Sequence, residues 1–218
     1  MYAKSVDKFT GGCFEFIEIS ADTIGSYNLR KVVIYYWYTI IKILVLRNWQ
    51  NKVKYDQTIQ RTFRVCPFDC DGLRVMTAAK YPIYMDFIRW ELIARSKLFK
   101  AIVKRGLAPT LGSQKIIYRR PLKIWSKFDV VLESVGMDDK WVYHVHYFEQ
   151  EDEVKAVGIT RSLIWKRDIP TALTDIMKEV GATEKKVPPL WVLSVFKQDK
   201  EIIQIANQKT IASKGYKA

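Results

Sequence analysis

The stretch that decides the fold is RVCPFDCDGLRVMTAAKYPIYMDFIRWELIARSKLFKAIVKRG, residues 64–106. The segment Ile59–Cys66, which overlaps the start of this stretch, alternates polar and apolar side chains, and this pattern is typical of a strand. Pro67 ends that strand because proline has no backbone N–H to donate. Polar residues 69–72 then favour a turn, so the segment predicts a strand followed closely by a helix.

The helix predicted after this turn is long. Thr77 is a suitable N-cap and Gly106 is a suitable C-terminal glycine, so we expect a helix from Thr77 to about Arg105. Pro82 falls in the first turns, where proline is tolerated. A single apolar stripe follows the spacing of three and four, formed by Ile83, Phe87, Trp90, Ala94, Leu98 and Ile102. This stripe needs an apolar surface to cover it.

Four strands are predicted after the helix, with short loops that suit antiparallel hairpins. They span Gly112–Arg119, Trp125–Val135, Lys140–Glu149 and Val154–Lys166, and a short helix follows at Thr171–Val180. About five antiparallel strands can bury the stripe of one long helix by wrapping around it. The predicted fold class is therefore α+β, a hotdog fold in which an antiparallel sheet of about five strands wraps a long helix.

An apolar segment precedes this domain. Asn28 is a suitable N-cap for a helix over Val32–Leu46, a run shorter than the roughly 20 residues that cross a bilayer core. Trp49 and flanking basic residues extend the run. Three alternatives stay open: a short or tilted membrane helix, a helix in the interface or in a partner's groove, and a helix packed on the protein's own domain. In the first two, Val32–Trp49 would contact a membrane or membrane-protein subunits.

The expected organisation has four parts: an irregular arm at 1–27, the apolar helix at 28–58, the hotdog domain at 59–181, and a basic C-terminal extension at 182–218.

The formal net charge of +13 and pI of about 9.6 favour an anionic binding partner. Nucleic acid, an anionic membrane and a phosphorylated ligand such as coenzyme A are the candidates. No RNA-binding signature and no run of five like charges occurs, which disfavours nucleic acid. The three cysteines argue against a disulfide-built secreted domain, and the N-terminus lacks the apolar core of a signal peptide.

The helix-forming stretch also carries a family resemblance. Residues 64–72 resemble the front motif of the 4-hydroxybenzoyl-CoA thioesterase-like family, in which a strand leads into Asp-x-Asp and then a long helix. The likeness covers Thr62–Lys166 and looks closest to the membrane-anchored thioesterase superfamily members of animals. Further residues that carry it are Met76, Tyr81, Phe87, Arg89, Trp90 and the corner Tyr118–Leu122.

The resemblance implies a site for hydrolysis of a coenzyme A thioester. It gives Asp71 the role of nucleophile or general base, and it gives the amides near Thr77 and Ala78 the role of oxyanion donors. The sequence departs from many relatives, which have His and Asn where this chain has Val75 and Thr77. Without them, Asp71 as a turn former that bonds its own backbone is slightly favoured over a catalytic role.

Other polar residues have weaker implications. Arg119, Arg120 and Lys123 could bind the phosphates of coenzyme A or be ordinary surface charges, and no other cofactor is expected. Glu91 lies where other hotdog enzymes place a carboxylate, but its spacing favours an ion pair with Arg95.

The two histidines and the pair of nearby cysteines do not predict a metal site. His144 and His146 share one face of a strand but lack a third ligand, so contacts with strand neighbours or with the acidic turn at 150–153 are expected instead. Cys66 and Cys70 are four residues apart and distant in sequence from both histidines, which also disfavours zinc.

Two functions from different classes remain, together with RNA binding as a third. The favoured one is a non-catalytic structural subunit of a membrane-associated assembly, with the mitochondrial inner membrane as the expected location. The alternative is an active acyl-CoA thioesterase that uses Asp71 at a membrane surface. The hotdog resemblance implies a homodimer or another hotdog partner in either case.

Overall fold

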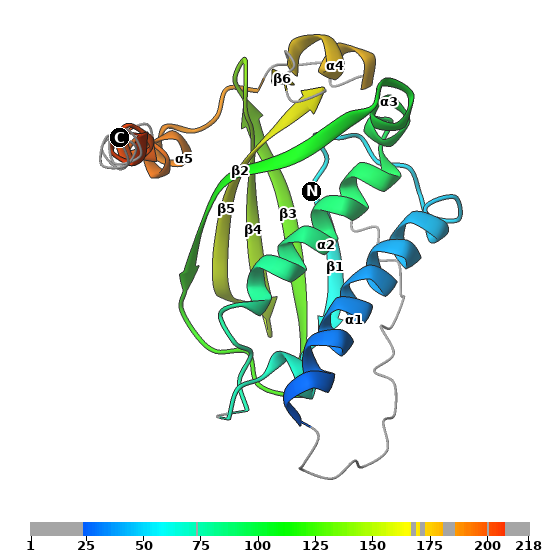
Figure 1. Cartoon of the computed structure of the whole chain (residues 1–218), viewed down its shortest axis with the longest axis vertical. Helices are drawn as coiled ribbons and strands as arrows, with labels where there is room; N and C mark the ends of the chain where they lie inside the picture. The colour runs from blue at the N-terminus through cyan, green and yellow to red at the C-terminus, as the bar shows by residue number, and fades with distance from the viewer. Residues whose placement is uncertain are drawn as a thin grey trace, which may run out of the picture.

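An antiparallel sheet forms the centre of the molecule (Figure 1). The computed structural model describes residues 24–72, 74–166, 169–170, 173–180, 186–199 and 201–207. The strand order is β1-β3-β4-β5-β2, and every neighbouring pair is antiparallel. This arrangement confirms the predicted α+β hotdog fold. The strands are β1 (Ile59–Arg64), β2 (Leu107–Tyr118), β3 (Lys127–Met137), β4 (Val142–Gln150), β5 (Glu153–Lys166) and the short β6 (Ile169–Pro170), which pairs with β5.

The largest error in the predicted strand limits is at β2, which begins five residues before the expected Gly112. Gly106 adopts the left-handed conformation, with φ of 62°. Its N–H donates to the Ile102 carbonyl oxygen at the end of the preceding helix. The chain therefore turns directly into the strand, which pairs with β5 from Leu107 onward. The predicted C-terminal glycine is confirmed.

The predicted single long helix is wrong, because it is two helices. α2 spans Lys80–Arg95 and α3 spans Leu98–Arg105. Between them Ser96 is extended; its hydroxyl donates to the Ile93 carbonyl oxygen at 3.1 Å and accepts from the Leu98 N–H at 3.3 Å. Serine in this position competes with the helical backbone for hydrogen bonds, so the chain breaks and restarts.

The predicted N-cap at Thr77 is also wrong. α2 begins three residues later, and its N-cap is Ala79, which makes no side-chain capping bond. Thr77 belongs instead to a turn, in which its carbonyl oxygen accepts from the Lys80 N–H at 3.0 Å. The tertiary contacts of the loop, described below, hold this turn in place.

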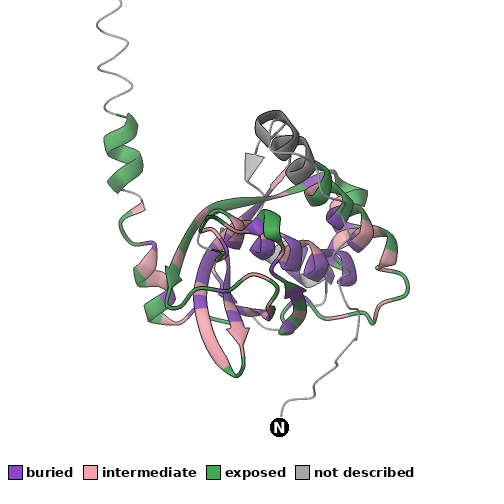
Figure 2. Cartoon of the chain, turned by 90° about the horizontal axis from the view of Figure 1, so that it is seen from below, coloured by how far each residue is buried: buried purple, intermediate pink, exposed green. Residues whose placement is uncertain are grey.

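α2 covers one face of the sheet, and the two form the main core (Figure 2). Phe63, Tyr84 and Phe128 meet there, with ring centroids 4.9 and 5.1 Å from Tyr84. Gly158 of β5 lets the helix approach closely, since a Cβ atom there would lie 2.6 Å from the Met85 sulfur. A larger residue at this position would therefore push α2 away from the sheet.

α1 spans Ile24–Leu46 and lies beside α2 (Figure 1). Ile40 and Ile43 are buried, and the Tyr36 ring lies 5.5 Å from that of Phe87. The predicted start at Asn28 is wrong, because an asparagine inside a helix costs less than about 1 kcal/mol and does not stop it. Most of the predicted arm, residues 1–23, lies outside the described residues.

The sequence alone leaves three environments open for the apolar helix: a membrane, an interface or a partner's groove, and the protein's own domain. One face of α1 packs on the protein's own domain. Within the described part of the chain, no helix has the length and apolar character that a membrane crossing needs.

The two helices that follow β5 pack against different parts of the molecule, and only the second belongs to the C-terminal extension. α4 (Leu173–Val180) adds to the main core, whereas α5 (Leu190–Val195) forms a second cluster with β3, β4 and β5. Val192 and Phe196 are buried against Tyr143, and Arg161 pairs with Asp199 at 2.5 Å. Because strand side chains alternate, Tyr143 faces α5 while its neighbour His144 faces α2.

Candidate functional site

The loop between β1 and α2 contains the predicted catalytic carboxylate. A single 3-10 turn at Pro67–Asp69 follows β1, and a bridge between Cys70 and Met76 closes the rest. Asp71 lies in that closed turn and is exposed; its N–H donates to the Val75 carbonyl oxygen at 3.1 Å. This backbone bond fits the turn-forming alternative, and a catalytic role for Asp71 stays a prediction.

The buried carboxylate of the loop is Asp69, to which sequence reasoning assigned no role. Its Oδ2 accepts from the Cys66 N–H at 3.0 Å and from the Tyr84 hydroxyl at 2.7 Å. Its Oδ1 pairs with Lys80 Nζ at 3.3 Å. Burial, followed by the charge of Asp69, raises the pKa of Tyr84 well above its ordinary value, so the phenol stays a donor. Asp69 therefore ties the loop to α2.

A local signal could have found this role. Asp69 comes three residues after Cys66, which precedes the 3-10 turn. At this spacing an acidic side chain can accept a hydrogen bond from the backbone N–H of the residue before the turn.

The predicted oxyanion donors lie next to this carboxylate. The Thr77 N–H donates to the Asp69 carbonyl oxygen at 2.8 Å, so that amide is already engaged. Ala78 is exposed, and its carbonyl oxygen accepts from the Tyr118 hydroxyl at 3.3 Å. The structure thus brings Asp71, Thr77 and Ala78 into one loop, and their catalytic roles stay predictions.

The three predicted phosphate-binding residues are exposed, and only one of them lies beside the loop that contains Asp71. Lys123 pairs with Val75 in an isolated bridge and so lies beside the loop. Arg120 pairs with Glu153 at 2.9 Å, and Arg119 donates to the Val154 carbonyl oxygen at 3.1 Å. Lys123 is therefore next to Asp71's loop, while the two arginines are engaged at the β4–β5 turn.

Glu91 is structural. Its carboxylate is buried and pairs with Arg95 at 2.9 Å, which confirms the predicted ion pair. It also pairs with Arg61 of β1 at 2.5 Å, a contact between strand and helix that sequence spacing does not show.

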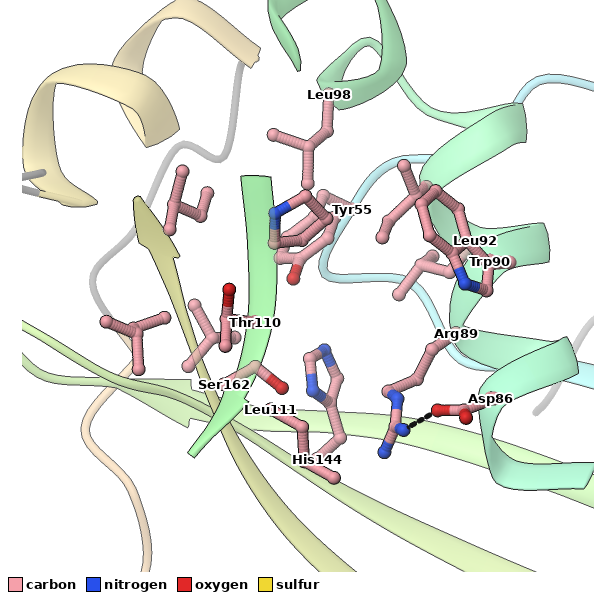
Figure 3. Close-up of a pocket in the computed structure, with 15 residues that line it drawn as sticks. Tyr55, Asp86, Arg89, Trp90, Leu92, Leu98, Thr110, Leu111, His144 and Ser162 are labelled. Atoms are coloured by element: carbon pink, nitrogen blue, oxygen red, sulfur yellow. Dashed lines mark hydrogen bonds and ion pairs between the residues drawn. The ribbon is translucent and has the colours of Figure 1, made fainter. Parts of the chain in front are cut away.

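A pocket lies between the middle of α2 and the strands β2, β4 and β5 (Figure 3). Its cavity volume is about 90 Å³. Tyr55, Arg89 and His144 point toward one another in it, and Arg89 Nη2 pairs with Asp86 at its side. No described residue of the loop at 65–79 lines this pocket, so the carboxylates of the Asp-x-Asp motif lie elsewhere.

The histidines contact their strand neighbours, as predicted, but not the acidic turn. Both rings are buried on the α2 side, and neither ring nitrogen of His144 has a hydrogen-bond partner among the described residues. Burial, then the charge of Arg89, lowers the pKa of His144 to about 3. The expected contact with the acidic turn fails because that turn lies beyond Gln150, at the far end of β4. Across the part of the chain that the structure describes, no three potential metal ligands gather.

Comparisons with known proteins fit this fold. The family model of the thioesterase-like superfamily matches residues 65–182, more than half of the chain. Protein THEM6 of Xenopus laevis is 33% identical over 99 residues, which cover 44% of this chain and 48% of that protein, so the chain spans about half the length of this relative.

Solved structures show the same fold. YbaW, a probable thioesterase from Escherichia coli, superposes with a TM-score of 0.54 at 18% identity, over 59% of this chain and 99% of that one. SAV2348 from Staphylococcus aureus, solved in complex with CoA, superposes with a TM-score of 0.53 at 17% identity, over 64% of this chain and 90% of that one. With the family match and the sheet wrapped around α2, the chain belongs to the thioesterase-like superfamily.

Proposed function

We propose that this chain is a non-catalytic structural subunit of a membrane-associated assembly. The observation that carries the proposal is an exposed apolar surface on α1. We call it the outer face of α1, and it consists of Ile34, Trp37, Tyr38, Ile41 and Val45. Their spacing of three and four places them on one side of the helix, where each is more than 40% exposed.

The opposite side of the same helix is already fixed. Ile40 and Ile43 are at most 4% exposed, and the Tyr35 and Tyr36 rings contact Phe87 of α2. The outer face is therefore presented by a helix that the domain itself holds in place. Covering such a contiguous apolar surface is favourable by about 25 cal/mol per Å², which favours docking against a partner surface.

The residues around the outer face suit the interface of a membrane. Tryptophan and tyrosine are enriched at the level of lipid headgroups, and basic side chains attract anionic lipids. Lys42 lies 6.0 Å from the Tyr38 ring centroid, and Arg47 stacks over Phe99 at 3.9 Å. Together with the net charge of +13, this favours an anionic membrane, and the mitochondrial inner membrane is the compartment to test first.

The loop before α2 supports the non-catalytic part of the proposal. Asp69 uses both carboxylate oxygens in structural contacts, and the Thr77 N–H is occupied by a backbone carbonyl. Val75 stands where many relatives have a histidine, so the loop lacks that polar partner for a substrate or a water molecule. These features support a fold that is kept for assembly.

The proposal is tested by weakening the outer face. Trp37→Ser combined with Ile41→Ser should move the full-length protein from the membrane fraction, and from a large native assembly, to a free form. Val103→Ser is the matched control, because Val103 is 65% exposed on α3 and outside this face. Membrane fractionation and native gel mobility give the readout. A wild-type protein that is free of membranes and assemblies, or a double variant that behaves like Val103→Ser, would contradict the proposal.

An active acyl-CoA thioesterase is the second candidate. It is favoured by family membership and by the exposed position of Asp71, in a loop whose Val75 pairs with Lys123. In this reading the site would be completed by a second hotdog copy, and β2 offers the surface. β2 is one of the two edge strands of the sheet, twelve residues long and mostly exposed. Loss of acyl-CoA hydrolysis on Asp71→Ala would favour this candidate.

A further inference from the structure

The pocket beside α2 combines apolar walls with a few polar groups that face inward (Figure 3). α2 supplies Trp90 and Arg89, β4 supplies His144, and β5 supplies Leu163. Tyr55 enters from the segment before β1, and its ring meets the His144 ring edge to face at 5.9 Å. Small-molecule sites in proteins are usually built this way, from apolar walls with a few convergent polar groups.

Two of those polar groups have unused hydrogen-bonding capacity. Arg89 pairs with Asp86 through Nη2, but its Nη1 is buried without a partner among the described residues. His144 is 2% exposed, and both of its ring nitrogens also lack partners there. Buried polar groups are nearly always hydrogen-bonded, because an unpaired one costs about 1–3 kcal/mol. These groups are therefore able to bond to a molecule in the pocket.

The unused groups favour an occupant that accepts hydrogen bonds. The guanidinium can only donate, and the Tyr55 phenol stays protonated because burial raises its pKa. A neutral imidazole has one N–H to donate, and burial with the nearby Arg89 keeps His144 neutral at pH 7. Three donors therefore face one space, and a carboxylate has enough lone pairs to accept from all three.

We propose that this pocket is a binding site for a small organic carboxylate. Its oxygens accept from Arg89 Nη1, the His144 N–H and the Tyr55 hydroxyl, and its short apolar body contacts Trp90, Leu98 and Leu163. A structural subunit needs no such ligand, so the inference goes beyond the proposed function and does not depend on it. The site is also separate from the Asp71 loop, none of whose residues line the pocket.

The test uses butyrate and the full-length protein. The chain has only two histidines, so the imidazole nitrogens of ¹⁵N-histidine-labelled protein report on this pocket with little overlap. Butyrate, at constant ionic strength against chloride, should shift the His144 signals saturably, with a dissociation constant on the order of 1 mM or tighter for so small a ligand. Butan-1-ol, which has the same carbon skeleton, should bind at least about tenfold more weakly because it offers no charged acceptor.

Variants assign the response to the pocket. Arg89→Gln should weaken butyrate binding by about tenfold or more. Arg64→Gln removes an exposed arginine of β1 and should leave it unchanged. Thr110→Trp is a second variant, for use if Arg89→Gln fails to fold. Thr110 is exposed and lines the pocket, so a tryptophan there should block butyrate binding without disturbing the core.

Three results would overturn the inference. One is the absence of a saturable His144 shift in the wild-type protein, which would mean that water or another part of the protein fills the pocket. Another is an equal response to butyrate and butan-1-ol. The third is a folded Arg89→Gln or Thr110→Trp protein that binds butyrate as well as Arg64→Gln does. None of these results would change the outcome of the membrane experiment on the outer face of α1.

Discussion

Asp69 and His144 are both buried polar side chains that face α2, one in the loop before the helix and one beside its middle. The Asp69 carboxylate has three partners, Cys66, Lys80 and Tyr84. The His144 ring has none among the described residues. Because a buried polar group is costly unless it is paired, the first site is complete as folded and the second is not. The buried carboxylate of the loop that resembles a catalytic motif is thus a structural element, while the unpredicted pocket has the character of a binding site.

The comparison predicts its largest effect at Asp69. Asp69→Ala leaves Lys80 and the Tyr84 hydroxyl without their partner, so we expect the free energy of unfolding to fall by about 3–5 kcal/mol. Asp71→Ala, two residues away but exposed, should cost less than about 1 kcal/mol. Urea denaturation of both variants measures the difference. Equal losses of stability would mean that the loop does not depend on its buried carboxylate.

The buried histidines predict a loss of stability on acidification. Burial and the charge of Arg89 lower the pKa of His144 to about 3, and the same two causes, burial first, lower that of His146. Below the ordinary pKa of 6.5 the unfolded chain therefore binds more protons than the folded one, so stability falls as the pH falls, over the window from 6.5 to about 3 for His144.

For the two rings together we expect a loss of about 2 kcal/mol in the free energy of unfolding between pH 6.5 and 5.5. His144→Phe should lose about half of this dependence, and denaturation curves at the two pH values give the readout. A variant with the same pH dependence as the wild-type protein would show that the His144 ring is already charged or solvated.

The smallest expected effect is stabilisation by a pocket ligand. At ten times its dissociation constant, butyrate should raise the free energy of unfolding by about 1.4 kcal/mol, because it binds only the folded state. Asp71→Ala should respond equally, whereas Arg89→Gln should not respond. Thermal melts with chloride as the reference salt test this. Loss of the response in Asp71→Ala would connect the loop and the pocket and so remove the distinction between them.

Local patterns in the sequence predict much of the fold. The alternation in the strands, the stripe on the helix and Gly106 give the order of elements and the hotdog architecture. The Glu91–Arg95 pair follows from helical spacing alone. The break at Ser96 is also a local effect, since a serine that caps its own neighbours interrupts a helix, and it was missed because the apolar stripe continues across the break.

The candidate site is harder to predict because its contacts are distant in sequence. The Asp69 carboxylate has a local partner in Cys66, but it also accepts from the Tyr84 hydroxyl, fifteen residues later in the sequence. The pocket depends on the register of β4 against β5 and on how α2 sits above them, which brings His144 near Arg89. The docking of one face of α1 on α2 likewise depends on packing, so an apolar run alone could not distinguish it from a membrane helix.

The most direct test of the account is hydrolysis of acyl-CoA thioesters of several chain lengths by folded full-length protein, beside Asp71→Ala. The account predicts no turnover above the buffer rate for either protein on any thioester, because we propose that the loop before α2 serves the fold and not the reaction. Turnover by the wild-type protein that falls by about 10²-fold or more in Asp71→Ala would contradict it, and would make Asp71 the base or nucleophile of an active thioesterase.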